Sequence, residues 1–122
     1  YLRDYIYIDD VVNAFLHASV MDYGILLNNN QITLNVASGK GTSVKEVFDL
    51  ISHEVEKITG IRGDIENVAW PEEVNEIEKR NYIGSIELIK SLTGWQPSVS
   101  LEEGIRLLVK HYSKEGIDNE VS

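Results

Sequence analysis

The sequence of 122 residues has no cysteine, only two prolines and few basic residues. The lack of cysteine excludes disulfides and thiolate metal sites, and it is compatible with a reducing compartment. Lysine and arginine together number 11, against 20 aspartates and glutamates, which gives a formal net charge of −9. Nucleic-acid binding needs clustered cations, and the sequence has no such cluster. We therefore expect no nucleic-acid partner.

Long apolar runs are also missing from the chain. None approaches the roughly 20 residues that a membrane-spanning helix needs, and no signal-peptide pattern opens the sequence. We therefore expect no membrane partner and a cytoplasmic location. The composition, 43% hydrophobic and 25% charged, is typical of one globular domain. The chain has no initiator methionine, and Tyr1 already belongs to an expected strand, so we interpret the sequence as a piece of a longer polypeptide.

The first 15 residues combine an expected short strand with an apolar helix. Side chains two residues apart share one face of a strand, so Arg3 shares its face with the tyrosines two and four residues later. Asp9 or Asp10 is suited to cap the helix expected over residues 10–21, because a carboxylate can accept its first free N–H groups. This helix is apolar almost all round, and we expect part of it to face a surface outside the chain.

Periodic patterns predict the elements in the middle of the chain. Residues 32–36 alternate between apolar and polar and are expected to form a strand, as are residues 61–68. Residues 43–46 (SVKE) form a capping box, which predicts a helix that ends at Gly60. The apolar face predicted for this helix comprises Val44, Val47, Phe48, Ile51, Val55 and Ile58.

The C-terminal third has a charged beginning and two further expected helices. Residues 72–80 are strongly charged and expected to be exposed. Ser85 is the expected cap of a short helix that Gly94 ends, and a second capping box at residues 100–103 opens the last helix. The domain is expected to cover residues 1–116, followed by a disordered tail over residues 117–122.

Several features could carry chemistry, and each has a plainer interpretation. The glycine-containing turn at residues 38–42 precedes a helix, where phosphates often bind, but it matches neither a P-loop nor the dinucleotide fingerprint. The plain turn is favoured. The three histidines fall on separate expected helices without the i, i+4 spacing of metal ligands, so they are expected to face solvent.

Arg3 keeps two open interpretations from its chemistry alone. Its guanidinium can donate two parallel hydrogen bonds to a diphosphate or a carboxylate ligand. It can equally form a structural salt bridge to Asp4 or Asp9. The residues themselves do not decide between a binding role and a structural role.

Four segments, in order, resemble the extended short-chain dehydrogenase/reductases that act as nucleotide-sugar epimerases and dehydratases. Residues 3–14 (RDYIYIDDVVNA) are similar to the family segment R-D-F-x-x-V-x-D-x-x-x-A. The other matches are residues 34–44 (LNVASGKGTSV), Tyr82 and residues 94–105 (GWQPSVSLEEGI). Together they extend over nearly the whole chain.

The resemblance implies a mixed α/β fold with three or four helices and short strands, the small C-terminal lobe of such an enzyme. It implies that Arg3 contacts the diphosphate of a nucleotide-sugar and that Tyr82 lies near the substrate pocket. Relatives bind NAD(P) on a Rossmann domain, which is absent from this chain, and use a tyrosine followed four residues later by lysine. No tyrosine here has a lysine at that spacing. We therefore expect no catalytic, cofactor-binding or metal-binding residue in the chain and no activity from it alone.

The resemblance also implies what the intact protein does. We expect an NAD(P)-dependent epimerase or dehydratase, such as a UDP-glucose 4-epimerase-like homodimer, in which this chain positions the nucleotide-sugar. A stand-alone nucleotide-sugar binding or interaction module, or a related reductase or decarboxylase, is the alternative. Many relatives have Gly-Asp before the tyrosine that matches Tyr82 and an aspartate at the position of Ser85. Arg80, Asn81 and Ser85 depart from that pattern and leave the details of the sugar pocket open.

Overall fold

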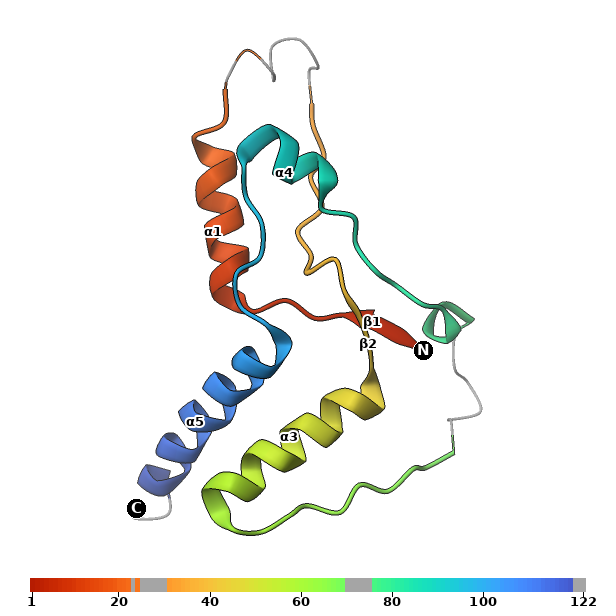
Figure 1. Ribbon diagram of the computed structural model, residues 1–122, viewed down its shortest axis with the longest axis vertical. Helices are drawn as coiled ribbons and strands as arrows, with labels where there is room; N and C mark the ends of the chain where they lie inside the picture. The colour runs from red at the N-terminus through yellow and green to blue at the C-terminus, as the bar shows by residue number, and fades with distance from the viewer. Residues whose placement is uncertain (23, 25–30, 70–75, 120–122) are drawn as a thin grey trace.

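The computed structural model describes residues 1–22, 24, 31–69 and 76–119. Helices α1 and α4 form one half of the molecule, α3 and α5 pack together in the other half, and a two-stranded sheet joins the halves (Figure 1). The expected mixed α/β architecture of helices and short strands is confirmed. The elements in order are β1 (Leu2–Asp4), α1 (Ile8–Ser19), β2 (Gly41–Ser43), α3 (Val44–Thr59), the 3-10 helix η1 (Glu76–Lys79), α4 (Glu87–Thr93) and α5 (Leu101–Asn119).

The sheet places the start of the chain beside the turn that precedes α3. β1 and β2 are antiparallel, with Arg3 opposite Thr42. Glycine at position 41 leaves room for Ile83, because a Cβ there would lie 2.6 Å from Cδ1 of Ile83 and the side chain of Ile83 would have to shift. The segment around residue 83 therefore packs directly against the sheet.

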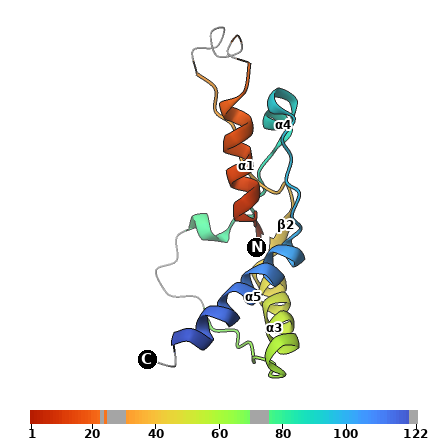
Figure 2. The same ribbon diagram turned by 90° about the vertical axis from the view of Figure 1, so that its left-hand side faces the viewer.

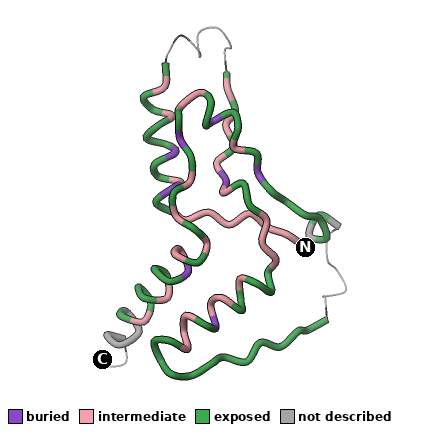
Figure 3. Tube along the Cα trace, viewed as in Figure 1, coloured by how far each residue is buried: buried purple, intermediate pink, exposed green. Residues whose placement is uncertain are grey.

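A small core joins α1 to α4. Ala14, Ile89 and Trp95 are buried together, and the indole N–H of Trp95 donates a hydrogen bond of 3.1 Å to the carbonyl oxygen of Asp10. Buried positions are few, and most of the trace is intermediate or exposed (Figure 3). No described helix combines the length and the hydropathy of a membrane span.

The predicted capping role of Asp9 or Asp10 is wrong. Helix α1 begins at Ile8, its N-cap is Tyr7, and no side chain makes the cap hydrogen bond. The carboxylate of Asp10, 1% exposed, instead accepts hydrogen bonds from the connection between α4 and α5. Its donors are the Ser98 N–H (3.0 Å), the Ser98 hydroxyl (2.8 Å) and the Val99 N–H (2.9 Å).

Helix α3 has the predicted ends but only part of the predicted packing. The capping box between Ser43 and Glu46 is present, and Gly60 ends the helix in the left-handed conformation with φ of 72°. Helix α5 covers only one side of α3, however. Three residues of the predicted apolar face remain about half exposed, namely Val44, Phe48 and Ile58.

The last two helices differ from the prediction at their N-terminal ends. The N-cap of α4 is Ile86, without a side-chain hydrogen bond, so the predicted cap at Ser85 is wrong, whereas Gly94 ends α4 as expected. In α5 the Ser100 hydroxyl accepts the Glu103 N–H at 3.2 Å, which is half of the predicted capping box. The helix continues to Asn119, so residues 117–119 of the expected tail are helical. Residues 120–122 lie outside the described part of the chain.

The strands predicted over residues 32–36 and 61–68 are not strands in this structure. Within the described ranges neither residues 32–36 nor residues 61–68 pair with a strand, and strand formation requires such a partner. Residues 32–36 keep the predicted alternation of burial, and Leu34 and Val36 pack on the core. Residues 61–68 are exposed throughout. Of the charged segment, residues 72–75 lie outside the described ranges and the rest includes η1.

Candidate functional site

Arg3 lies at the edge of the sheet and is held by backbone carbonyl groups. Its Nη1 atom donates to the carbonyl oxygen of Leu2 at 3.1 Å and also to the carbonyl oxygen of Arg80. The second bond joins residues 77 positions apart. These acceptors fix the guanidinium beside residues 80–82, although a strand position alone would leave a long side chain several rotamers.

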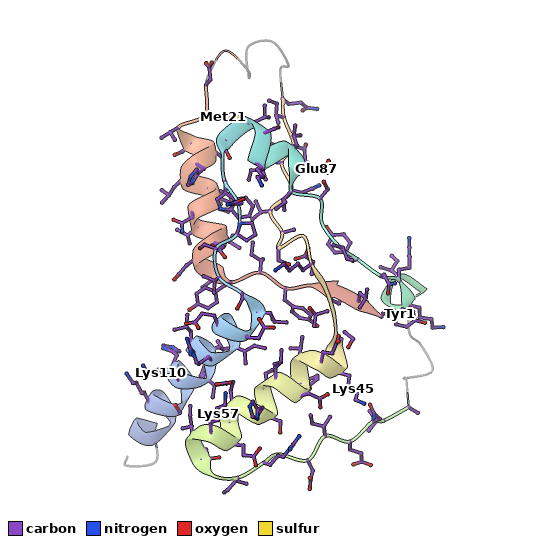
Figure 4. All side chains as sticks on the ribbon, viewed as in Figure 1. Tyr1, Met21, Lys45, Lys57, Glu87 and Lys110 are labelled. Carbon is purple, nitrogen blue, oxygen red and sulfur yellow. The ribbon has the colours of Figure 1, made fainter. Side chains whose placement is uncertain are left out.

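The segment of residues 80–82 runs beside β1 through two more hydrogen bonds. The Leu2 N–H donates to the Asn81 side-chain oxygen at 2.9 Å, and the Tyr82 N–H donates to the Leu2 carbonyl oxygen at 3.0 Å. The structure thus brings the two sequence-predicted site residues, Arg3 and Tyr82, to one edge. We call Arg3, Arg80, Asn81 and Tyr82 the Arg3 edge; its strand β1 directly follows Tyr1, which is labelled in Figure 4.

Asn81, which departs from the family pattern, joins the segment of residues 80–82 to β1. Its side-chain oxygen accepts the N–H of Leu2 next to Arg3. Tyr82 is 64% exposed, so it lies on the surface rather than in the core. Sequence reasoning did not find the contact of Asn81 with β1, because no local pattern indicates a partner 79 residues away.

Asp4, which the sequence offered as a salt-bridge partner of Arg3, binds backbone N–H groups of other segments. Its carboxylate accepts three backbone N–H groups, from Ser38 at 2.7 Å, Gly39 at 3.0 Å and Gly84 at 3.1 Å. Adjacent residues of a strand point to opposite faces, which directs Asp4 away from the side of Arg3. The carboxylate of Asp4 is thus engaged by the backbone of residues 38, 39 and 84.

The same contacts explain the glycine-containing turn at residues 38–42. A phosphate cradle uses backbone N–H donors, and those of Ser38 and Gly39 already bind the carboxylate of Asp4. Gly39 has a φ of 74°, a conformation that favours glycine for backbone reasons alone. The turn therefore holds an internal anion, and its residues do not fit a dinucleotide phosphate.

Several cationic side chains lie close together in sequence or space at the Arg3 edge. Arg80 and Lys79 are exposed next to the half-buried Arg3, in a chain whose formal charge is −9. A guanidinium can bind a phosphate oxygen pair through two parallel hydrogen bonds, and a tyrosine ring offers a flat surface to a sugar or base. The edge is thus suited to an anion that carries a ring system.

The histidines and carboxylates of the described residues form no alternative centre. All three histidines are exposed, as predicted, and Nδ1 of His17 is 2.9 Å from the carbonyl oxygen of Asn13 in its own helix. Nowhere in the described ranges do three potential metal-ligating side chains gather in a metal-binding geometry.

Two hollows lie away from the Arg3 edge. The larger, about 710 Å³, lies between the turn at residues 38–42, α3 and the start of α5. Its charged lining is Lys40 with the carboxylates of Glu46, Asp49 and Glu102, which disfavours a phosphate. The smaller, about 290 Å³, is mostly apolar and lies between residues 5–8, α3 and α5. Neither is lined by Arg3 or Tyr82.

Comparison with known proteins identifies relatives of the chain. No protein-family model matches it. A protein of Methanocaldococcus jannaschii named "Putative UDP-glucose 4-epimerase" is 36% identical over 107 residues, which are 88% of this chain and 30% of that protein. The crystal structure of UDP-glucose 4-epimerase from Thermotoga maritima with UDP-glucose aligns with a TM-score of 0.70 and 36% identity, over 94% of this chain and 32% of that one.

A more distant structure has the same fold. RMD from Pseudomonas aeruginosa, complexed with NADPH, aligns with a TM-score of 0.64 and 20% identity, over 93% of this chain and 33% of that chain. The chain spans about a third of the length of the relatives that it matches, and the match falls in their C-terminal part. The resemblance inferred from the four sequence segments is confirmed.

Proposed function

We propose that this chain, which belongs to the family of UDP-glucose 4-epimerases and related NAD-dependent epimerases, dehydratases and reductases, is the nucleotide-sugar-binding portion of such an enzyme. It orients the nucleotide-sugar and neutralises part of the diphosphate charge. Hydride transfer then takes place on a nucleotide-binding domain outside this chain, with NAD(P) as the cofactor.

The observation that carries the proposal is the guanidinium of Arg3 held at the carbonyl oxygen of Arg80, with the exposed Tyr82 joined through its N–H to the neighbouring Leu2. Two carbonyl oxygens hold the guanidinium at Nη1, and an arginine fork is suited to a diphosphate because it can bind an oxygen pair through two parallel hydrogen bonds. Tyr82 flanks the sugar in this arrangement. The UDP-glucose present in the Thermotoga maritima epimerase supports this class of ligand.

The chain itself has few groups that could bind or use a dinucleotide cofactor. The donors of its glycine-containing turn bind Asp4, and none of its tyrosines precedes a lysine at the catalytic spacing. NAD(P) therefore belongs to the domain outside this chain, and the NADPH in the Pseudomonas aeruginosa structure supports a cofactor in the intact enzyme. We also propose that the intact enzyme is a homodimer, which its mass in solution tests.

The test is Arg3→Ala in the polypeptide as its gene encodes it. Loss of a charge-assisted hydrogen bond is expected to weaken UDP-glucose binding by about 1.5–3 kcal/mol, measured by calorimetry. Arg106→Ala is the matched control, because Arg106 is an exposed arginine on α5 that pairs with Glu103. An Arg3→Ala affinity equal to that of the control removes Arg3 from the site.

A related reductase is the second candidate. It is favoured by nucleotide-sugar reductases among the relatives, including the GDP-6-deoxy-D-mannose reductase of Pseudomonas aeruginosa, which is 23% identical over 112 residues. A reductase consumes NAD(P)H stoichiometrically with a keto-sugar, whereas an epimerase interconverts two sugars without net consumption. Monitoring NAD(P)H absorbance alongside sugar composition separates the two reactions.

A further inference from the structure

Asn81 lies at the centre of the hydrogen bonds that hold the Arg3 edge together. Its side-chain oxygen accepts the Leu2 N–H at 2.9 Å. The peptide group before it carries the Arg80 carbonyl oxygen, to which Nη1 of Arg3 donates. The peptide group after it carries the Tyr82 N–H, which donates to the Leu2 carbonyl oxygen at 3.0 Å. All three contacts therefore depend on where residue 81 lies.

The side chain of Asn81 takes the place of a backbone acceptor beside β1. Both backbone polar groups of Leu2 bond to residues 81 and 82, as they would to a neighbouring antiparallel strand. Here a side-chain oxygen replaces the carbonyl group of that strand. The bond is exposed, so water can replace it and its loss costs less stability than the loss of a buried bond. Water would not, however, keep the segment in place.

A second contact holds the same segment three residues later. The Gly84 N–H donates to the carboxylate of Asp4 at 3.1 Å. On the other side of Asn81 the chain leads back to η1, and Figure 2 shows, as Figure 1 does, that η1 lies beside the N-terminus. Removal of the Asn81 side chain therefore leaves the contact of Gly84 intact and loosens the chain at Arg80, whose carbonyl oxygen holds Arg3.

We propose that Asn81 is a positioning residue for Arg3, which keeps the Arg80 carbonyl oxygen against the guanidinium and so directs the guanidinium toward the diphosphate of the nucleotide-sugar. The inference rests on the proposed function, in which Arg3 binds that diphosphate. An arginine has a planar head on a flexible stem, and restricting it before the ligand arrives lowers the entropy lost on binding. The amide of Asn81 also accepts its hydrogen bond without adding a negative charge beside an anion.

A double-mutant cycle in the polypeptide as its gene encodes it tests the proposal. The affinity for UDP-glucose is measured by calorimetry for the native sequence, Arg3→Ala, Asn81→Ala and the double variant. Asn67→Ala is the matched control, because Asn67 is an exposed asparagine in the segment of residues 61–68, outside the Arg3 edge. Urea unfolding followed by circular dichroism reports the stability of each variant.

Asn81→Ala is expected to weaken binding at least about threefold when Arg3 is present and less than about twofold in the Arg3→Ala background. The same loss in both backgrounds overturns the proposal, because a residue that only supports the fold affects both proteins equally. A loss no larger than that of Asn67→Ala overturns it as well.

A second variant keeps the test decisive if Asn81→Ala does not fold. Asn81→Ser then takes its place in the cycle, since the shorter side chain cannot reach the Leu2 N–H unless the segment shifts. A native polypeptide that does not bind UDP-glucose rejects the proposed function and the inference with it. Binding that is weakened by Arg3→Ala but not by the substitution at position 81 retains the function and rejects only the inference.

Discussion

Asp4 and Asp10 each join segments that are far apart in the sequence. Each carboxylate accepts three hydrogen bonds, and the donors belong to residues 34 to 89 positions later. A carboxylate that accepts several backbone N–H groups in a covered position stabilises one relative placement of those segments. Asp4 thus fixes the turn before β2, and Asp10 fixes the connection between α4 and α5.

Asp10→Asn tests this interpretation at the level of one residue. The amide keeps the shape of the side chain but turns one acceptor into a donor, which then faces the donors of Ser98 or Val99. We expect the free energy of unfolding to fall by about 1–3 kcal/mol in urea titrations. Asp9→Asn is the control, because Asp9 is exposed in the same helical turn. An equal, small effect of both substitutions would contradict a stabilising role for the Asp10 carboxylate.

The pH dependence of stability gives a second test at Asp10. Burial alone raises the pKa of this carboxyl, but the hydrogen bonds from Val99 and Ser98 outweigh it and leave the pKa below its ordinary value. A folded-state pKa below the unfolded value stabilises the protein above the unfolded pKa, and this stabilisation is lost as the pH falls through the folded pKa. We therefore expect the stability difference between the native sequence and Asp10→Asn to shrink below about pH 4. A difference that stays constant from pH 7 to pH 3 would count against this cause.

At the scale of elements, the ends of α3 are determined by local residues. The Ser43 hydroxyl accepts the Glu46 N–H at 3.2 Å, and the Glu46 carboxylate accepts the Ser43 N–H at 2.8 Å. The pKa of Glu46 is lowered by hydrogen bonds from the hydroxyl and then from the backbone of Ser43. Both residues lie within one turn of the helix start, so the capping box could be read directly from the sequence.

Ser43→Ala is expected to destabilise α3 by about 0.5–2 kcal/mol, because one free N–H group at the helix start loses its acceptor. The measurement is urea unfolding followed by circular dichroism. Ser91→Ala provides the comparison, since the Ser91 hydroxyl only donates to the Leu88 carbonyl oxygen within α4. A Ser43→Ala protein as stable as the Ser91→Ala protein would show that the cap does not contribute.

Prediction from sequence succeeded for local signals and failed for pairing between distant segments. Gly60 and Gly94 end their helices in the left-handed conformation, as their positions predicted. The alternation of residues 32–36 correctly predicted which side chains are covered, but a strand also needs a neighbour, and alternation does not specify one. Asp10 was misinterpreted for the same reason, because its donors at residues 98 and 99 leave no sign near position 10.

For the whole molecule, the family and the mixed α/β architecture could be predicted because four short segments occur in the family's order. The proximity of Arg3 and Tyr82 was implied only by that resemblance. The carbonyl groups that hold Arg3, and the contact of Asn81 with Leu2, come from folding across 77 and 79 positions. Periodicity and motifs describe residues that are neighbours in sequence. They could not predict contacts between residues 77 and 79 positions apart.

The division of labour between this chain and a second domain makes a prediction about NAD(H). The chain alone is expected not to bind NADH, because the N–H donors of its glycine-containing turn already bind Asp4 and its charge of −9 disfavours an anionic dinucleotide. The measurement is a titration followed by NADH fluorescence, with circular dichroism to verify the helices. The polypeptide as its gene encodes it is the positive comparison. A saturable fluorescence change with the chain alone would place cofactor binding within these 122 residues and contradict the proposed division.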